Sequence, residues 1–160
     1  MKYLALFLIL CVLVVGVVAG YELLNTRLAV TGQGLQTTPA AGRADEFAAL
    51  QSAMSRDSLE GTVFQSGELT DAADYSFQIY TIRLKNNGLL PAEMVEVQLS
   101  QLSGDVLYYG ESSEVVIAPG ATRDVWVSIL TTDGTKKARD FYITYYIWGH
   151  PQTMKFTYSG

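Results

Sequence analysis

Residues 75–84 read YSFQIYTIRL and form the stretch that most clearly specifies a β fold. β-Branched and aromatic side chains, which strands favour, fill most of its positions. The apolar residues alternate in two phases: Tyr75, Phe77 and Ile79, then Tyr80, Ile82 and Leu84. We expect a β-bulge near Ile79 and Tyr80, because one inserted residue moves the alternation to the other parity.

Strand candidates of the same kind lie on both sides of this stretch. They cover residues 62–64, 94–99, 106–109, 114–117, 125–130, 141–148 and 154–158. Turn residues separate them, because Gly and Asn accept positive φ and Pro interrupts a strand; examples are Asn86-Asn87-Gly88, Ser103-Gly104, Pro119-Gly120 and Asp133-Gly134. Short strands at intervals of roughly ten residues are typical of an antiparallel β-sandwich, which we predict over residues 61–160.

Residues 22–60 have a different pattern. Residues 23–31 end in a period-two run that predicts a short strand, and the residues from Gly32 to Pro39 predict a loop because they are rich in Gly, Thr and Pro. An amphipathic helix is expected over residues 45–54, where Phe47, Leu50 and Met54 recur on one face. We expect this region to link the sandwich to the N-terminal segment.

The N-terminal segment, residues 1–21, is apolar and carries no charge from Tyr3 to Gly20. As a helix it covers roughly the 30 Å hydrocarbon thickness of a bilayer, so we expect contact with membrane lipid over residues 3–21. It is interpreted as an uncleaved signal anchor; the alternative is a signal peptide cut after Ala19 or Gly20, which would release a secreted protein. Lys2 and the α-amino group favour a cytoplasmic N-terminus and an extracytoplasmic body.

Two small features lie inside this segment. Cys11 follows Leu10, which is too large for a lipoprotein cleavage site, so Cys11 is interpreted as one more apolar residue. Gly16 and Gly20 form a G-x-x-x-G pattern that can bring two membrane helices together, although small residues there also suit cleavage. Since Cys11 is the only cysteine, the body is expected to hold no disulfide.

The composition excludes several classes of function. The chain has 160 residues and a net charge of -5, and an acidic balance argues against a nucleic-acid partner. One His and one Cys cannot form a Cys/His zinc site, and His150 has no nucleophile motif near it, so we expect no metal, no cofactor and no catalytic residue. Glu68, Asp71 and Asp74 could supply oxygen ligands for calcium, but their spacing fits no calcium loop.

Aromatic residues supply the candidate binding surface. Along residues 141–148, Tyr142, Tyr146 and Trp148 share one parity, and Phe141, Ile143, Tyr145 and Ile147 share the other. The first set could form an exposed platform for a glycan or a protein, joined by Tyr108 and Tyr109. The alternative, which we favour, is a central strand covered on both faces, with the 45–54 helix on one of them. Lys136, Lys137 and Arg139 are expected to form a solvated turn, with contact to anionic lipid or wall polymer as the alternative.

Two stretches carry a resemblance. They read RLKNNGLLPAEMVEVQL at residues 83–99 and EVVIAPGATRDVWVSI at residues 114–129. A strand ending in Asn-x-Gly, a Pro-Ala step into a Val-rich strand, and Ala-Pro-Gly before the next strand resemble the cell-adhesion-related Ig-like modules of bacterial cell surfaces. The layout as a whole is similar to small exported or membrane-anchored proteins of Gram-positive bacteria. The resemblance implies an Ig-like sandwich and an extracytoplasmic location.

These observations predict a mainly β protein: an N-terminal transmembrane or signal helix, a short amphipathic helix and an antiparallel Ig-like β-sandwich. The expected function is that of a non-catalytic, membrane-tethered module that contacts a protein or the cell envelope. Two alternatives stay open. One is a secreted accessory subunit or small exported enzyme, and the other is a surface fibre subunit.

Overall fold

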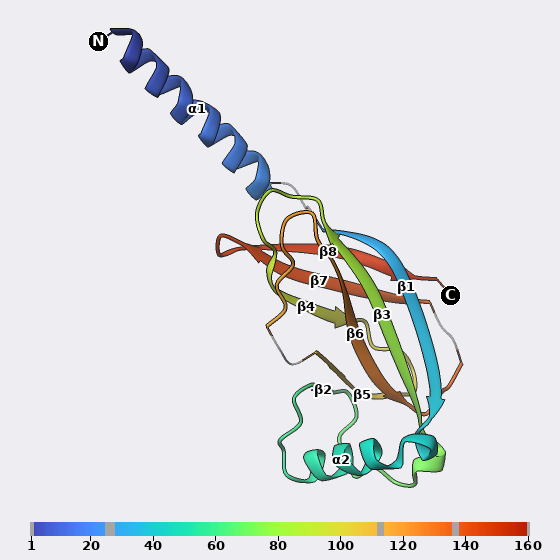
Figure 1. Cartoon of the computed structure of the whole chain (residues 1–160). Coiled ribbons are helices and arrows are strands. Elements are labelled where there is room, and N and C mark those ends of the chain that lie inside the picture. The colour runs from blue at the N-terminus through green and yellow to red at the C-terminus, as the bar shows by residue number, and fades with distance from the viewer. Residues whose placement is uncertain (1, 25–27, 112–113, 136–137, 160) are drawn as a thin grey trace.

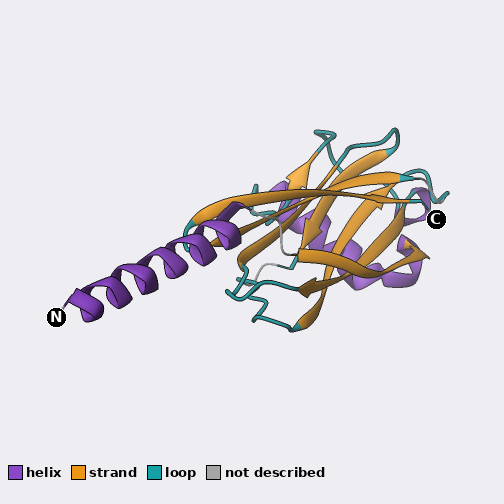
Figure 2. Cartoon of the chain, turned by 90° about the horizontal axis from the view of Figure 1, so that it is seen from above, coloured by secondary structure: helices purple, strands orange, loops and turns teal. Residues whose placement is uncertain are grey.

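The computed structural model describes residues 2–24, 28–111, 114–135 and 138–159. The chain is mainly β, with an apolar helix α1 (Lys2–Leu24) and a shorter helix α2 (Ala44–Ser55). The two helices lie at opposite ends of the β structure, and α1 projects away from it (Figures 1 and 2). The predicted fold class is confirmed at this level, as are both predicted helices.

Two antiparallel sheets make up the body. The larger, five-stranded sheet has the order β1 (Leu28–Pro39), β3 (Ser76–Asn86), β6 (Thr122–Thr131), β5 (Asp105–Gly110) and β2 (Thr62–Val63). The smaller, three-stranded sheet has the order β4 (Glu93–Leu99), β7 (Arg139–Ile147) and β8 (His150–Tyr158). Two 3-10 turns, η1 (Ala40–Arg43) and η2 (Ala72–Asp74), complete the elements.

The main core lies between the two sheets. Alternate side chains of β3, β6 and β7 are buried in it: Tyr80, Ile82, Leu84, Val125, Val127, Ile129, Phe141, Ile143 and Tyr145. The rings of Tyr80 and Phe141 meet edge to face across the sheets, with their centroids 5.0 Å apart. The inward faces predicted for the strands at 125–130 and 94–99 are confirmed, with Val95 and Leu99 buried and Val97 half-buried.

A second core lies beneath α2, on the outer face of the larger sheet. Phe47 and Leu50 of α2 pack there against Phe77, Leu107 and Leu130 of the sheet. The first residues of β3 are therefore covered on both faces, and this produces the change of phase in its apolar pattern. The expected β-bulge is wrong, since Ile79 and Tyr80 pair in unbroken register with Ser128 and Val127.

The loop predicted for residues 32–39 is also wrong. These residues continue β1, which pairs with β3 from Leu28 opposite Asn86 to Pro39 opposite Ser76. The hydrogen bonds that β1 makes along β3 outweigh the low strand preference of Gly and Pro. β1 is an edge strand, where both residues are tolerated, and its pairing shifts between Val30 and Gly32. The 28–39 segment thus belongs to the sheet.

The strand predicted at 114–117 does not form. Val115 and Ile117 are buried in the main core as expected of a strand, but the segment makes only an isolated bridge, between Ile117 and Ala92. The backbone N–H of Val95 also donates to the carbonyl of Val115, at 3.0 Å. The turn at residues 118–121 then leads the chain into β6.

Candidate functional site

The outer face of the β4–β7–β8 sheet holds the centre of the predicted binding surface. β7 turns Phe141, Ile143, Tyr145 and Ile147 into the core, so that Tyr142 and Tyr146 point outward. Tyr142 is 40% exposed and Tyr146 is half-buried. The interpretation that we favoured, a strand covered on both faces, is wrong at Tyr142. α2 follows β1 after a single short turn, so it lies over the larger sheet instead.

Polar side chains surround the two tyrosines. Tyr142 lies between Gln98 of β4 and Lys155 of β8 in the ladder. In the next row, Thr144 lies between Glu96 and Thr153, and the two threonine hydroxyls are 3.2 Å apart. The amide of Gln98 donates to Glu96 at 3.1 Å. The face is therefore a sheet surface that combines aromatic rings and hydroxyls with one amide and the charged groups of Glu96 and Lys155.

An ion pair fixes one edge of this face. The Lys155 ammonium lies 2.8 Å from the carboxylate of Asp140, which also accepts a hydrogen bond from the Thr157 hydroxyl at 2.6 Å. Lys155 and then Thr157 lower the pKa of Asp140 below its ordinary value, and Asp140 raises the pKa of Lys155. The ammonium also lies over the Tyr142 ring, 6.0 Å from its centroid, which orients that ring.

The other aromatic residues predicted for the platform lie elsewhere. Tyr108 and Tyr109 belong to β5 of the larger sheet; Tyr108 packs on Phe64, with ring centroids 5.5 Å apart. Tyr109 donates a hydrogen bond to Glu46 of α2, and burial, followed by this bond, raises its pKa. Trp148 lies at the tip of the β7–β8 hairpin. Only Tyr142 and Tyr146 therefore share the candidate face.

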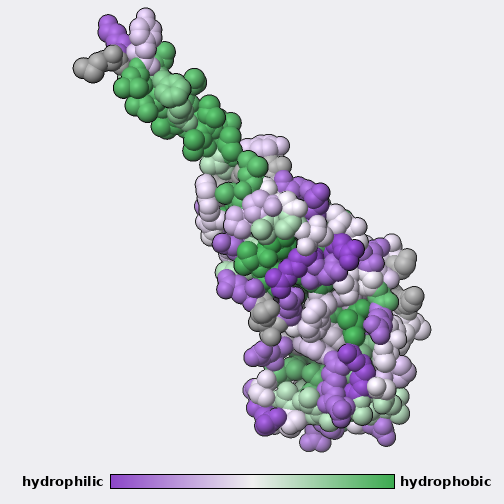
Figure 3. Space-filling view, in the orientation of Figure 1, coloured by the Kyte–Doolittle hydropathy of each residue, from purple (hydrophilic) through white to green (hydrophobic). Residues whose placement is uncertain are grey.

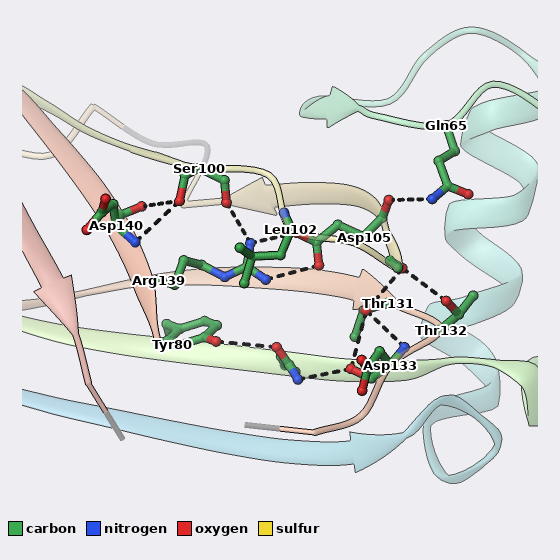
Figure 4. Close-up of polar contacts among 12 residues, drawn as sticks. Gln65, Tyr80, Ser100, Leu102, Asp105, Thr131, Thr132, Asp133, Arg139 and Asp140 are labelled. Atoms are coloured by element: carbon green, nitrogen blue, oxygen red, sulfur yellow. Dashed lines mark hydrogen bonds and ion pairs between the residues drawn. The ribbon is translucent and has the colours of Figure 1, made fainter. Parts of the chain in front are cut away.

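The three basic residues expected together at the turn before β7 do not form one solvated cluster. Arg139 is only 2% exposed, so its assignment to a solvated turn is wrong; Lys136 and Lys137 lie outside the described residues. The Arg139 guanidinium makes two contacts with the Asp105 carboxylate, at 2.7 and 3.0 Å, and donates to the carbonyl of Ser100 at 2.9 Å (Figure 4). The arginine holds the sheets together and is not available to a ligand.

Sequence reasoning missed several residues of the candidate face. Lys155 and Thr153 could have been found from the alternation of polar and apolar residues in 150–158, once its pairing with 141–147 is assumed. Thr144 shares the parity of Tyr142 and Tyr146 within 141–148. Of the carboxylates considered for calcium and set aside, Asp71 accepts a hydrogen bond from the N–H of Ala73 and Asp74 accepts one from the Thr70 hydroxyl. Within the described ranges, no group of three or more His, Cys, Asp or Glu side chains could hold a metal ion.

Comparison with known proteins gives little further information. No protein-family model matches the chain, and no curated protein matches it. Among solved structures, the crystal structure of a FixG-related protein from Vibrio parahaemolyticus is similar at 12% identity and a TM-score of 0.39. That match covers 81% of this chain and 94% of the other.

Proposed function

We propose that this protein is a non-catalytic binding module that α1 tethers to the extracytoplasmic side of a membrane. The outer face of the β4–β7–β8 sheet is its contact surface. The observation that carries the proposal is the exposure of Tyr142 on a sheet face whose neighbouring side chains are polar or charged. Tyrosine is favoured at protein contacts because it supplies a large rigid surface and one hydrogen-bonding group.

The tether rests on the character of α1. The span Lys2–Tyr21 is long and apolar enough to cross a membrane, and none of it is buried against the body. The 23 residues of α1 extend about 34 Å, which matches a bilayer. An apolar helix without a protein cover requires lipid around it. Lys2 on the N-terminal side supports a cytoplasmic N-terminus and an exported body.

The strand order supports an Ig-like topology for the body. β1-β3-β6-β5 in one sheet and β4-β7-β8 in the other correspond to the order A-B-E-D and C-F-G of constant-type Ig domains. β2 extends the D edge by a short pairing with β5. On this topology the candidate face is the outer surface of the C-F-G sheet, and its ligand is a protein or an envelope polymer.

Site-specific photocrosslinking in intact cells tests this function. A photoreactive phenylalanine replaces Tyr142 in the full chain, and the same residue at Gln36 serves as the control. Gln36 is exposed on β1 of the other sheet, so it reports random collisions at the same membrane. We expect a discrete crosslinked species from position 142 and none from position 36. Equal crosslinking at both positions, or none at 142, would contradict the proposal.

A further inference from the structure

We infer that the end of the sandwich nearest α1 docks on the lipid bilayer, with Leu89 and Trp148 inserted beside the anchor. The inference rests on the proposed anchoring of α1, and it adds a second membrane contact to the module. The apolar surface of α1 reaches the body at this end (Figure 3). The exposed loop tips thus contact the outer leaflet of the same bilayer that holds α1.

A small apolar cavity joins the anchor to the loops. α1 lines it between Val14 and Ala19, and the body lines it with Leu89, Leu90 and Trp148. The cavity measures about 220 Å³ and is open to the outside. No charged side chain lines it. The two loop tips therefore lie beside a part of α1 that would itself be in lipid.

The position along α1 sets the depth of the contact. Val15 lies six residues before Tyr21, which corresponds to about 9 Å along a helix. If Tyr21 marks the boundary with water, side chains beside Val14 to Ala19 reach into the outer part of the hydrocarbon layer. Peripheral segments that bind membranes insert their apolar side chains to a depth of roughly 5–10 Å, so the two depths agree.

The loop tips have the chemistry of an interfacial anchor. Leu89 is 67% exposed and Trp148 is 61% exposed, although both are large and apolar. Trp148 occupies the first position of the two-residue turn between Ile147 and His150, with φ of 49°, followed by Gly149 with φ of 76°. Asn or Gly suits that position better, so the sequence places an indole there at a conformational cost. Indole rings favour the lipid–water interface.

The distribution of charge agrees with docking at this end. No Asp, Glu, Lys or Arg occurs in the loops at residues 87–92, 118–121 and 147–152. The 118–121 loop lies beside the first of these, since Gly120 donates to the carbonyl of Asn86. The opposite end, around α2, carries the acidic residues Asp45, Glu46, Asp57, Glu60, Glu68, Asp71 and Asp74. These three loops thus present uncharged surface to the bilayer, and the acidic residues around α2 lie at the end that faces water.

Tryptophan fluorescence of the full chain in phosphatidylcholine vesicles tests the inference. Trp126 and Trp148 are the only tryptophans, so W126F leaves Trp148 as the reporter and W148F leaves Trp126 as the control. With lipid brominated in the upper acyl chain, we expect Trp148 emission to fall about twofold or more and Trp126 emission to stay unchanged. If W126F does not fold, the difference between wild-type and W148F spectra isolates the Trp148 signal.

Vesicle flotation separates failure of the docking from failure of the anchor. A chain that floats with the vesicles while bromine leaves Trp148 emission unchanged overturns the docking and keeps the anchor. Trp148 that is shielded from aqueous acrylamide, yet not quenched by bromine, is covered by protein such as a second copy, which also overturns the docking. A chain with an intact N-terminus that does not float overturns both the anchor and the docking.

Discussion

Arg139 and Asp105 form a buried ion pair that joins the two sheets of the sandwich. Arg139 begins β7 of the smaller sheet, and Asp105 begins β5 of the larger one. Their side chains are 1% and 2% exposed, and two N–O contacts of 2.7 and 3.0 Å connect them. The Asp105 carboxylate also accepts the N–H of Leu102 at 2.7 Å, so the pair fixes the loop before β5 as well.

Removing one partner of this pair is expected to destabilise the protein strongly. Arg139→Met leaves the Asp105 carboxylate buried without its counter-charge, which costs about 3–5 kcal/mol of the free energy of unfolding. Asp105→Leu is expected to have a similar effect, because it leaves the Arg139 guanidinium buried without its counter-charge. Chemical unfolding of the full chain in detergent, followed by circular dichroism, measures both.

The double variant Arg139→Met with Asp105→Leu provides the control. Because it removes both charges, it is expected to be less destabilised than Arg139→Met alone, and the double-mutant cycle then gives a positive coupling. Additive losses would show that the two residues act independently and would contradict the role assigned to the pair.

Tyr109 is expected to make the stability fall at alkaline pH. Burial between α2 and β6, and its bond to Glu46, raise the pKa of Tyr109 in the folded state above the ordinary value near 10. The stability from this group is complete below the unfolded pKa and is lost as the pH rises toward the folded value. Tyr109→Phe is expected to lose part of this decline, measured as the unfolding midpoint from pH 8 to pH 11. An unchanged decline would assign it to other groups.

The period-two patterns were enough to predict the inward faces of β4 and of residues 125–129 in β6, because alternate side chains there face the main core. For β7 the pattern separated two sets of residues but did not show that only one of them is covered. The same reasoning failed for β3, because Phe77 faces α2 while Tyr80 faces the other sheet. Nothing local in the sequence shows that a helix covers one end of a strand. The location of Arg139 depended in the same way on a distant partner, Asp105, that only the topology brings near.

The candidate face could be predicted in part. The parity of residues 141–148 correctly separates Tyr142 from Tyr145, but it does not say which neighbours stand beside Tyr142. Lys155 and Thr153 join the face only through the register of β7 with β8. Tyr108 and Tyr109 were placed with the face by residue type alone, and the order of strands puts them in the other sheet.

Substitutions on the two faces of β7 are expected to differ sharply in their effect on the free energy of unfolding. Tyr145 is fully buried, so Tyr145→Ala should cost about 3–5 kcal/mol, as expected for truncation of a large core side chain. Tyr142→Ala removes a partly exposed ring and should stay within about 1 kcal/mol. Urea unfolding of the full chain in detergent measures the pair. Equal losses at both positions would make Tyr142 a core residue and would remove it from the proposed contact surface.

The fate of α1 decides whether the module is tethered. We expect the mature chain to keep Met1 or Lys2 and to stay in the membrane pellet after carbonate extraction, because the apolar run is longer than the 7–15 residues usual in a signal peptide. Protease added to intact cells should digest the body, since Lys2 favours a cytoplasmic N-terminus. A cytoplasmic protein that survives the protease is the control for cell integrity. A chain that begins at Gly20 or Tyr21 and is recovered from the medium would identify α1 as a signal peptide. That result would leave the Tyr142 face as the only contact surface of the released protein.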